Sequence, residues 1–223
     1  MRAVVFDFDG VLVDSEPLHF QALHASLLPE GIRIERDDYY ARYLAYDDRG
    51  SIRRALEDHG ISPDDEQMDR IARRKADSFE EVRKRVAFFP GARSLVRTLA
   101  TQVPLGIASG ARHAEIEAIL DAGGLREPFS VIVGADDVSR TKPDPAPYLA
   151  AAGQLAAFVP GLKPGECLAF EDSLPGIESA LAAGMKVVAV AHSYPPEMLR
   201  SAHRVVESLV GLEHDGLRDL FPS

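Results

Sequence analysis

The chain has 223 residues, enough for one large domain or for a main domain with a modest second one. Hydrophobic residues make up 46% of the sequence and charged residues 27%, a balance typical of globular proteins and not of disordered or fibrous chains. The formal net charge is -10 and no long basic block occurs. Nucleic acid is therefore not an expected partner, although a local basic pocket for phosphate is compatible with this charge.

The single cysteine, Cys167, excludes an internal disulfide and lies in an apolar run, where we expect it to be a small core residue. No signal peptide is recognisable before the first strand, and no apolar stretch is long enough to cross a bilayer. We therefore expect a cytoplasmic protein without a membrane partner. The sequence leaves the oligomeric state open, and a monomer is the default expectation.

The first predicted strand, residues 3–6, ends in two aspartates, Asp7 and Asp9, followed by Gly10. A short apolar run that stops in carboxylates is typical of a buried parallel strand, and ligands bind at the carboxyl ends of such strands in open α/β sheets. Two carboxylates held together near pH 7 repel each other, and a divalent cation relieves the repulsion. The pair therefore predicts a carboxylate and magnesium site in which one aspartate is the nucleophile. A solvated strand end is the alternative.

The stretch after this strand contains no convincing strand and combines many charges with apolar residues at helical spacing, such as Leu23 and Leu27. It is far longer than a single crossover helix requires. We therefore predict an all-helical domain, residues 15–87, inserted into a Rossmann-like core that consists of residues 1–14 and 88–223.

Further apolar runs, with helical patterns between them, predict the remaining strands. These strands are residues 104–108, 131–133, 167–170, 187–190 and a short one at 205–206. Strands that alternate with helices imply right-handed crossovers. The predicted fold class is therefore α/β, with a doubly wound, mostly parallel sheet covered by helices on both faces.

The strand at 104–108 is followed by Ser109, Gly110 and Ala111, directly before a predicted helix. A hydroxyl group followed by free backbone N–H groups at a helix N-terminus forms a cradle for phosphate. An ordinary N-cap is the alternative interpretation of Ser109.

Lys142 precedes Pro143 and Pro145, which fix the local backbone and give the ammonium group a defined direction. If it points to the carboxyl ends of the strands, it can neutralise a phosphate and orient the nucleophilic carboxylate. A solvated loop lysine is the alternative.

The strand at 167–170 is followed by Glu171, Asp172 and Ser173. Two strands that deliver acids to one edge of a sheet form a cation site with oxygen ligands, and magnesium together with phosphate suits such a site. Acidic capping of the following helix is the alternative, and it is compatible with metal binding.

The order of these motifs is more specific than any one of them. The chain runs from Asp-x-Asp through a helical insertion to Ser-Gly, Lys-Pro and Glu-Asp-Ser-x-x-Gly, each after or beside a predicted strand. This order resembles the haloacid dehalogenase superfamily over essentially the whole chain. It is most similar to the branch of β-phosphoglucomutase and small sugar-phosphate phosphatases, which carry a helical cap between the first two motifs. Residues 6–15 and 171–176 are the most specific segments.

The resemblance implies a phosphoaspartyl mechanism. Asp7 would attack phosphorus, and Asp9 would protonate the leaving oxygen and then activate water. Mg2+ would be held by the Asp7 carboxylate, the backbone carbonyl of Asp9 and Asp172, with Glu171 in its surroundings. Three groups would hold the transferring phosphoryl group: Ser109, the Gly110 amide and Lys142.

The resemblance also implies that the cap holds the other end of the substrate. His19 matches a position at the entrance between cap and core, and Arg49 matches a cap-loop arginine that contacts a distal phosphate. Lys75 falls near a substrate-facing lysine of this branch. Without the resemblance, a surface histidine and a solvated, dipole-matched helix explain His19 and Lys75 equally well.

The leading interpretation is a Mg2+-dependent phosphatase of small phosphorylated metabolites, with sugar phosphates as the expected class. A β-phosphoglucomutase is the nearest alternative, but the family's mutases carry Lys-Gly where this chain has Ala45 and Tyr46, and Ala-Ser where it has Gly110 and Ala111. A phosphorylated receiver module is a more remote alternative, because receivers have about half this length and no helical cap. A non-catalytic binding module is disfavoured because every motif residue is present.

Overall fold

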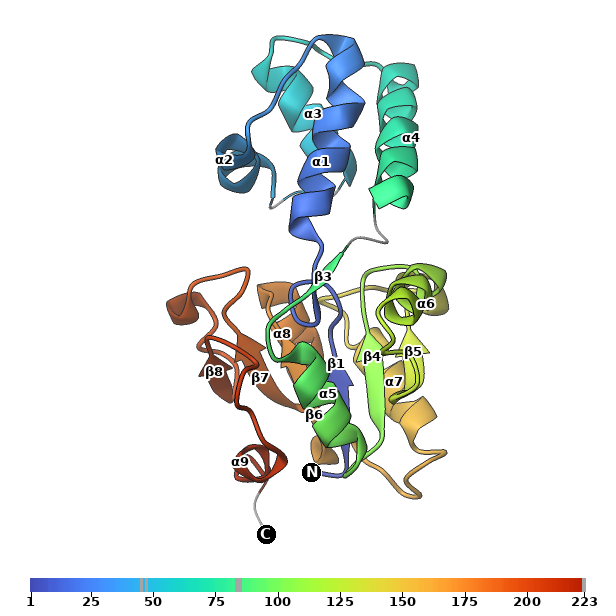
Figure 1. The fold of residues 1–223 in the computed structure, drawn as a ribbon, viewed down its shortest axis with the longest axis vertical. Helices are drawn as coiled ribbons and strands as arrows, with labels where there is room; N and C mark the ends of the chain where they lie inside the picture. Colours follow the sequence, from blue (N-terminus) through green and yellow to red (C-terminus); the bar gives the residue numbers. More distant parts are fainter. Residues whose placement is uncertain (45, 47, 83–85, 222–223) are drawn as a thin grey trace. The chain divides into compact units, whose positions relative to one another are not determined.

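The computed structural model describes residues 1–44, 46, 48–82 and 86–221. The chain folds into two compact units (Figure 1). The core unit comprises Met1–Asp14 and Ala87–Ser223, and the helical unit comprises Ser15–Val86. Each unit contains a hydrophobic cluster of its own.

A six-stranded sheet forms the centre of the core unit, and all of its neighbouring strands are parallel. In spatial order the strands are β5 (Phe129–Val133), β4 (Leu105–Ala108), β1 (Ala3–Phe6), β6 (Cys167–Glu171), β7 (Lys186–Val190) and β8 (Arg204–Val206). The predicted doubly wound parallel sheet is confirmed.

Only β5 begins clearly outside its predicted bounds, two residues before Val131. Leu105 pairs with Phe129 and Gly106 with Val131, so the register slips by one residue at Ser130. The Ser130 side chain is exposed, and this polar residue interrupts the apolar run from which the strand was predicted.

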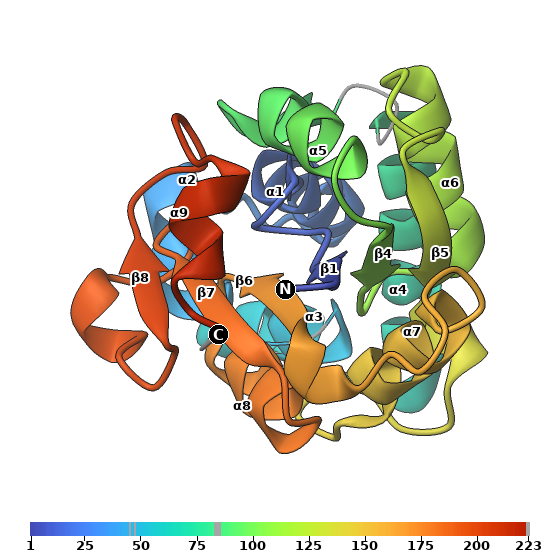
Figure 2. The same ribbon diagram turned by 90° about the horizontal axis from the view of Figure 1, so that it is seen from below.

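The four residues of β1 are completely buried, as are those of β4. Helices on both faces explain this burial. Two helices, α7 (Ala146–Leu155) and α8 (Leu174–Ala182), cover one face (Figure 2). Helices α5 (Ala92–Ala100) and α9 (His214–Arg218) cover the other face, and α6 (His113–Ala122) packs against β5.

Local sequence explains where the helices beside the site begin and end. In α6 the side chains of Ile116 and Leu120 are buried on one face, and Gly124, with a positive φ of 60°, follows the end of the helix. Helix α8 begins after Ser173, whose hydroxyl accepts a hydrogen bond from the Gly176 N–H at 3.2 Å. This cap satisfies one of the N–H groups that a helix N-terminus leaves unpaired.

The order of the strands reverses beside β1. From β1 the chain goes first to β4 and β5 on one side, and later to β6, β7 and β8 on the other. Such a switch point opens a crevice at the carboxyl ends of the two strands that flank it, here β1 and β6. A separate antiparallel pair, β2 (Val13–Asp14) and β3 (Ala87–Phe88), joins the two places where the chain leaves and re-enters the core unit.

The helical unit contains α1 (Glu16–Leu27), α2 (Arg36–Asp38), a π-helical turn (Tyr39–Tyr43), α3 (Asp48–Asp58) and α4 (Asp65–Val82). No strand occurs among its described residues. Apolar side chains from these helices, including the predicted Leu23 and Leu27, form one buried cluster. Across the described part of the chain, every helix is too short or too polar to cross a membrane.

Candidate active site

Three buried carboxylates meet at the switch point. Asp7 follows β1, and Glu171 and Asp172 lie at the end of the neighbouring β6, where the Asp7 N–H donates to the Phe170 carbonyl at 2.9 Å. One oxygen from each carboxylate lies within 4.8 Å of the other two. We call Asp7, Glu171 and Asp172 the acid cluster. The sequence predicted that two strands deliver acids to one edge, and the structure brings these residues together.

Lys142 reaches the acid cluster from the loop before α7. Its Nζ atom donates to Asp7 Oδ1 at 2.7 Å and to Glu171 Oε1 at 2.6 Å, and only 12% of its side chain is exposed. A solvated loop lysine is thereby excluded. Burial alone lowers the pKa of Lys142, but the carboxylates of Asp7 and Glu171 outweigh burial and raise it. The ammonium group therefore stays charged and holds Asp7 in place.

Glu171 is completely buried and saturated with hydrogen bonds. Besides Lys142, its carboxylate accepts hydrogen bonds from the Tyr148 hydroxyl at 2.8 Å, from the Asp172 N–H at 3.0 Å and from both the N–H and the hydroxyl of Ser173. A Cβ atom on Gly176 would lie 1.9 Å from Glu171 Oε1, so glycine is required for α8 to pack here. Glu171 therefore positions Lys142 and the start of α8.

Asp172 is held differently. Its carboxylate accepts a hydrogen bond from the Ser193 hydroxyl, and it fills the space in which Gly10 has no side chain. A Cβ atom on Gly10 would lie 2.0 Å from Asp172 Oδ2, and Gly10 has a φ of +77°, which favours glycine. The turn after β1 therefore packs directly against this carboxylate.

The electrostatics of the acid cluster suit a divalent cation. Burial raises the pKa of Asp7 to about 7. The negative charge of Glu171 acts in the same direction, and the positive charge of Lys142 acts against it. Burial and the charges of Asp7 and Glu171 also raise the pKa of Asp172. Three acids face one lysine, so the cluster has an excess of negative charge and offers oxygen donors only. This is the environment in which Mg2+ binds in proteins, and the residues present therefore fit that ion.

Asp9 lies in the tight turn after β1 and is half-buried. In this turn the Gly10 N–H donates to the Val13 carbonyl at 2.9 Å, and the Leu12 N–H donates to the Phe8 carbonyl at 2.9 Å. Among the described residues, the acid cluster does not include the carboxylate of Asp9. The charge of Asp9 nevertheless contributes to the raised pKa of Asp7.

Ser109 lies at the end of β4, the strand on the other side of β1. It is buried, its N–H donates to the Val133 carbonyl at 3.0 Å, and its hydroxyl accepts from the Ala111 N–H at 3.1 Å. The N-cap of α6 is Arg112, so the alternative of Ser109 as an ordinary N-cap is wrong. A Cβ atom on Gly110 would meet no atom within 4 Å, which leaves its backbone open on that side.

Three residues that contact the site, Tyr148, His192 and Ser193, were not predicted from the sequence. Tyr148 lies in α7, where an aromatic residue is normally interpreted as part of the core. His192 and Ser193 follow β7 after Ala191, and the rule that polar residues after parallel strands reach the ligand edge would have identified them. His192 donates from Nδ1 to the Gly10 carbonyl at 2.8 Å, and its ring stacks on Phe89 with centroids 3.8 Å apart.

The predicted cap residues all belong to the helical unit. The ring of His19 stacks on Phe79 with centroids 4.3 Å apart, and Arg49 Nη1 lies 2.6 Å from Asp69 Oδ1. Lys75 is almost completely buried and pairs with the exposed carboxylate of Asp48. This pairing gives Lys75 a structural role within the unit that the sequence did not indicate. Substrate contacts by His19, Arg49 and Lys75 stay predictions.

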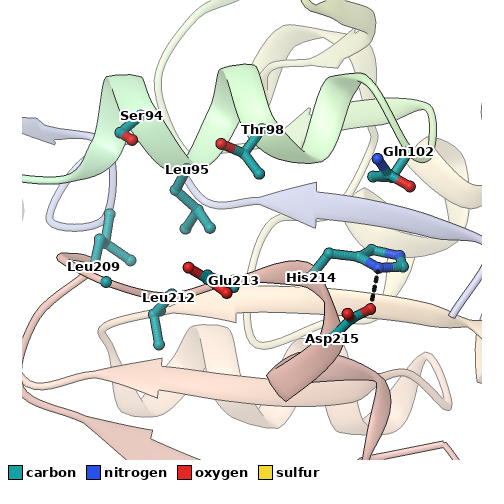
Figure 3. Close-up of a pocket in the computed structure, with 10 residues that line it drawn as sticks. Ser94, Leu95, Thr98, Gln102, Leu209, Leu212, Glu213, His214 and Asp215 are labelled. Carbon is teal, nitrogen blue, oxygen red and sulfur yellow. Dashed lines mark hydrogen bonds and ion pairs between the residues drawn. The ribbon is translucent and has the colours of Figure 1, made fainter.

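A cavity of about 360 Å3 lies elsewhere in the core unit, between α5 and residues 209–215 (Figure 3). His214 Nδ1 and Asp215 Oδ1 lie 3.3 Å apart at its edge. No residue of the acid cluster lines this cavity. The predicted chemistry therefore does not take place there.

Comparisons with known proteins agree with this geometry. A family model of haloacid dehalogenase-like hydrolases matches residues 1–184. The protein CbbY of Rhodobacter capsulatus is 31% identical over 203 residues, which cover 87% of each chain. A phosphorylated carbohydrates phosphatase of Thermotoga maritima is 31% identical over 196 residues, covering 86% of this chain and 87% of the relative.

Among solved structures, a mutant of CbbY from Rhodobacter sphaeroides in complex with xylulose-1,5-bisphosphate has a TM-score of 0.79 and 26% identity. The alignment covers 97% of this chain and 99% of that one. The match to the family model spans the first strand, the helical insertion and every motif discussed above. The chain belongs to the haloacid dehalogenase-like hydrolases.

Proposed function

We propose that this protein is a Mg2+-dependent phosphatase of small phosphorylated metabolites, with sugar phosphates as the substrate class, and that it acts through a phosphoaspartate on Asp7. The observation that carries the proposal is the placement of Asp7, a buried carboxylate beside Lys142 and Asp172 at the switch point of the sheet. The name of the Thermotoga maritima relative and the sugar bisphosphate bound to R. sphaeroides CbbY support this substrate class.

In the first half of the reaction, a carboxylate oxygen of Asp7 forms a bond to phosphorus while the bond from phosphorus to the substrate oxygen breaks. Asp9 donates its proton to that oxygen, and the alcohol leaves. Lys142 neutralises the transferring oxygens from one side, and Ser109 with the Gly110 amide would bind them from β4. Positioning and charge neutralisation supply most of the catalysis in phosphoryl transfer.

In the second half, a water molecule attacks phosphorus and the bond between phosphorus and Asp7 breaks. Asp9, now ionised, accepts the proton of the water, so that both aspartates return to their starting states and inorganic phosphate is released. Asp7 must be ionised at the start while Asp9 is protonated. The Lys142 ammonium group in contact with Asp7 favours the ionised form and opposes the effect of burial on its pKa.

Mg2+ would be held by the carboxylates of Asp7 and Asp172 and by the backbone carbonyl of Asp9, where it would neutralise charge on the phosphoryl oxygens. Glu171, whose oxygens already accept five hydrogen bonds from the protein, would orient Lys142 beside this site. We further propose that the helical unit is the cap, and that His19, Arg49 and Lys75 act on the distal part of the substrate.

A β-phosphoglucomutase would use the same core residues and return the phosphoryl group to a sugar hydroxyl. Ala45, which replaces a lysine of the mutases, lies outside the described residues. Gly110 and Ala111 also differ from the Ala-Ser of the mutases. The phosphatase is therefore the proposed activity, and the mutase is an outcome that the following experiment can detect.

The test measures phosphate release from a panel of phosphorylated metabolites, with Mg2+ and then with EDTA. The panel includes β-glucose 1-phosphate with its bisphosphate activator. We expect Mg2+-dependent release from one or a few sugar phosphates, and a loss of about a thousand-fold or more in Asp7→Asn. Conversion of β-glucose 1-phosphate to the 6-phosphate with little free phosphate would identify a mutase. Wild-type activity in Asp7→Asn would remove Asp7 as the nucleophile.

A further inference from the structure

Residues 192 and 193 contact the site from β7, a strand that carries none of the family motifs. We propose that Ser193 and His192 are positioning residues that restrain Asp172, and that Ser193 thereby sets the affinity of the site for its divalent cation. The inference rests on the proposed function, because it assumes that the acid cluster binds a divalent cation.

The topology of the sheet brings Ser193 to Asp172. Strands β6 and β7 are parallel neighbours, with Ala189 opposite Glu171, so the chain that leaves β7 passes beside the end of β6. There the Ser193 hydroxyl donates a hydrogen bond to Asp172 Oδ2. Among the described residues, the Asp172 carboxylate accepts one hydrogen bond, from Ser193. The Glu171 carboxylate, by contrast, accepts five.

A single donor suits a metal ligand. The hydrogen bond to Oδ2 fixes the rotation of the carboxylate, so that Oδ1 would be available to a cation. A carboxylate saturated with donors, as Glu171 is, has little capacity left for a metal. Hydrogen bonds to the ligands of a metal orient them before the ion binds, and their loss typically weakens binding by about 10-fold to 100-fold. Ser193 meets this description for Asp172.

His192 acts on the same carboxylate indirectly, through the turn after β1. Its Nδ1 atom donates to the Gly10 carbonyl at 2.8 Å, and its ring is stacked on Phe89 with an interplanar angle of 18°. Gly10 in turn packs on Asp172 so closely that a Cβ atom would lie 2.0 Å from Oδ2. Adjacent residues of one loop therefore restrain the Oδ2 end of the Asp172 carboxylate, Ser193 directly and His192 through the turn after β1.

The experiment measures Mn2+ binding to the metal-free full-length chain by electron paramagnetic resonance, without substrate. We expect Ser193→Ala to raise the Kd for Mn2+ by about 10-fold, and Ser193→Thr to keep it near the wild-type value because the hydroxyl is retained. Ser208→Ala is the matched control. It removes a serine hydroxyl that accepts only a local hydrogen bond from the Val210 N–H, and it should leave the Kd unchanged.

A second readout separates positioning from folding. In Ser193→Ala the Mg2+ concentration required for half-maximal phosphate release should rise by the same factor, while kcat at saturating Mg2+ stays near that of the wild type. His192→Phe provides an independent variant should Ser193→Ala not fold. It keeps a ring to stack on Phe89 and removes only the donor to Gly10, and we expect a Kd raised several-fold.

The outcomes are distinct. Wild-type Mn2+ affinity in Ser193→Ala would overturn the inference and leave the phosphatase proposal standing. A wild-type protein that binds no Mn2+ would instead overturn the proposed function itself. Weaker Mn2+ binding in Ser193→Ala, restored in Ser193→Thr, supports the assigned role.

Discussion

At the scale of single residues, the three carboxylates of the acid cluster differ in what surrounds them. Glu171 accepts five hydrogen bonds, Asp7 shares Lys142 with it, and Asp172 is held by the Ser193 hydroxyl. Environment assigns different functions to chemically similar groups. In the proposed mechanism Glu171, with the most hydrogen bonds, positions its neighbours. Asp7 and Asp172, which accept fewer hydrogen bonds, would react with phosphorus and bind the cation.

Asp7 should make the stability of the metal-free protein depend on pH. The pKa of Asp7 rises from its ordinary value near 4 to about 7 in the folded protein. Between these values the folded state binds a proton that the unfolded chain has released, so this group destabilises the folded state as pH rises. We expect Asp7→Asn, relative to wild type, to gain stability between pH 5 and pH 8, by roughly 1–3 kcal/mol.

Urea unfolding in EDTA at pH 5, 6, 7 and 8 measures this difference. Asp69→Asn is the control, because the Arg49 guanidinium group lowers the pKa of Asp69 and its charge does not change in this range. Its stability relative to wild type should be the same at all four pH values. A pH-independent difference for Asp7→Asn as well would show that the carboxylate is not protonated in the folded state.

At the scale of elements, glycines allow the loops and helices to approach the acid cluster. Gly10 allows the turn after β1 to lie on Asp172, and Gly176 allows the first turn of α8 to lie on Glu171. The shape of the site therefore depends on these glycines, which have no side chain, as much as on the carboxylates. The two positions favour glycine for different reasons. Gly10 has a positive φ as well as a close contact, whereas Gly176 has ordinary helical geometry and only the close contact.

Gly176→Ala tests this role, with Gly153→Ala as the matched change in another helix. A Cβ atom at Gly176 would lie 1.9 Å from Glu171 Oε1, and one at Gly153 in α7 would meet no atom within 4 Å. We expect Gly176→Ala to destabilise the protein by about 1–3 kcal/mol. Gly153→Ala should stabilise it by roughly 0.5–1 kcal/mol, because alanine is the better helix former.

Urea unfolding at pH 7 compares these two variants with the wild type. Gly176→Ala should also lower phosphate release, because a displaced Glu171 no longer holds Lys142. Equal stability of Gly176→Ala and Gly153→Ala would show that Glu171 moves aside freely.

At the scale of the whole molecule, the chain forms two compact units. Each has its own buried cluster, and the short pair of β2 and β3 joins the chain where it leaves and re-enters the core unit. Asp14 lies opposite Ala87 in this pair, which is the arrangement at the end of a β-hairpin. A short turn from Asp14 to Ala87 could therefore connect the two segments of the core unit in place of the helical unit.

Replacement of residues 15–86 by an Asn-Gly turn should consequently leave a folded core unit. We expect cooperative unfolding and retained Mn2+ binding, because the acid cluster belongs entirely to the core unit. Discrimination among the phosphorylated metabolites of the panel should be lost, because the proposed cap residues are removed. Circular dichroism, Mn2+ titration and the phosphate-release panel measure these three properties. An unfolded product would show that the core requires the helical unit.

Local sequence was sufficient to predict the sheet, the helical insertion and the main residues of the site. Buried parallel strands appear as short apolar runs, and the residue after each run lies at the ligand edge whatever the rest of the chain does. Asp7, Ser109 and Glu171 could be placed in this way. The interruption at Ser130 shortened the prediction of β5, because periodicity cannot detect a register slip.

Which of these residues contact one another could be learned only from the tertiary structure. The contact of Lys142 with Asp7 spans 135 positions of the chain, and those of Tyr148 with Glu171 and Ser193 with Asp172 span 23 and 21. No local pattern encodes such pairs, because the strand order and the helix packing bring them together. The pairing of Lys75 with Asp48 in the helical unit has the same origin. Local sequence therefore determined which groups follow the strands to the ligand edge, and folding determined which further residues reach the site and which groups each carboxylate contacts.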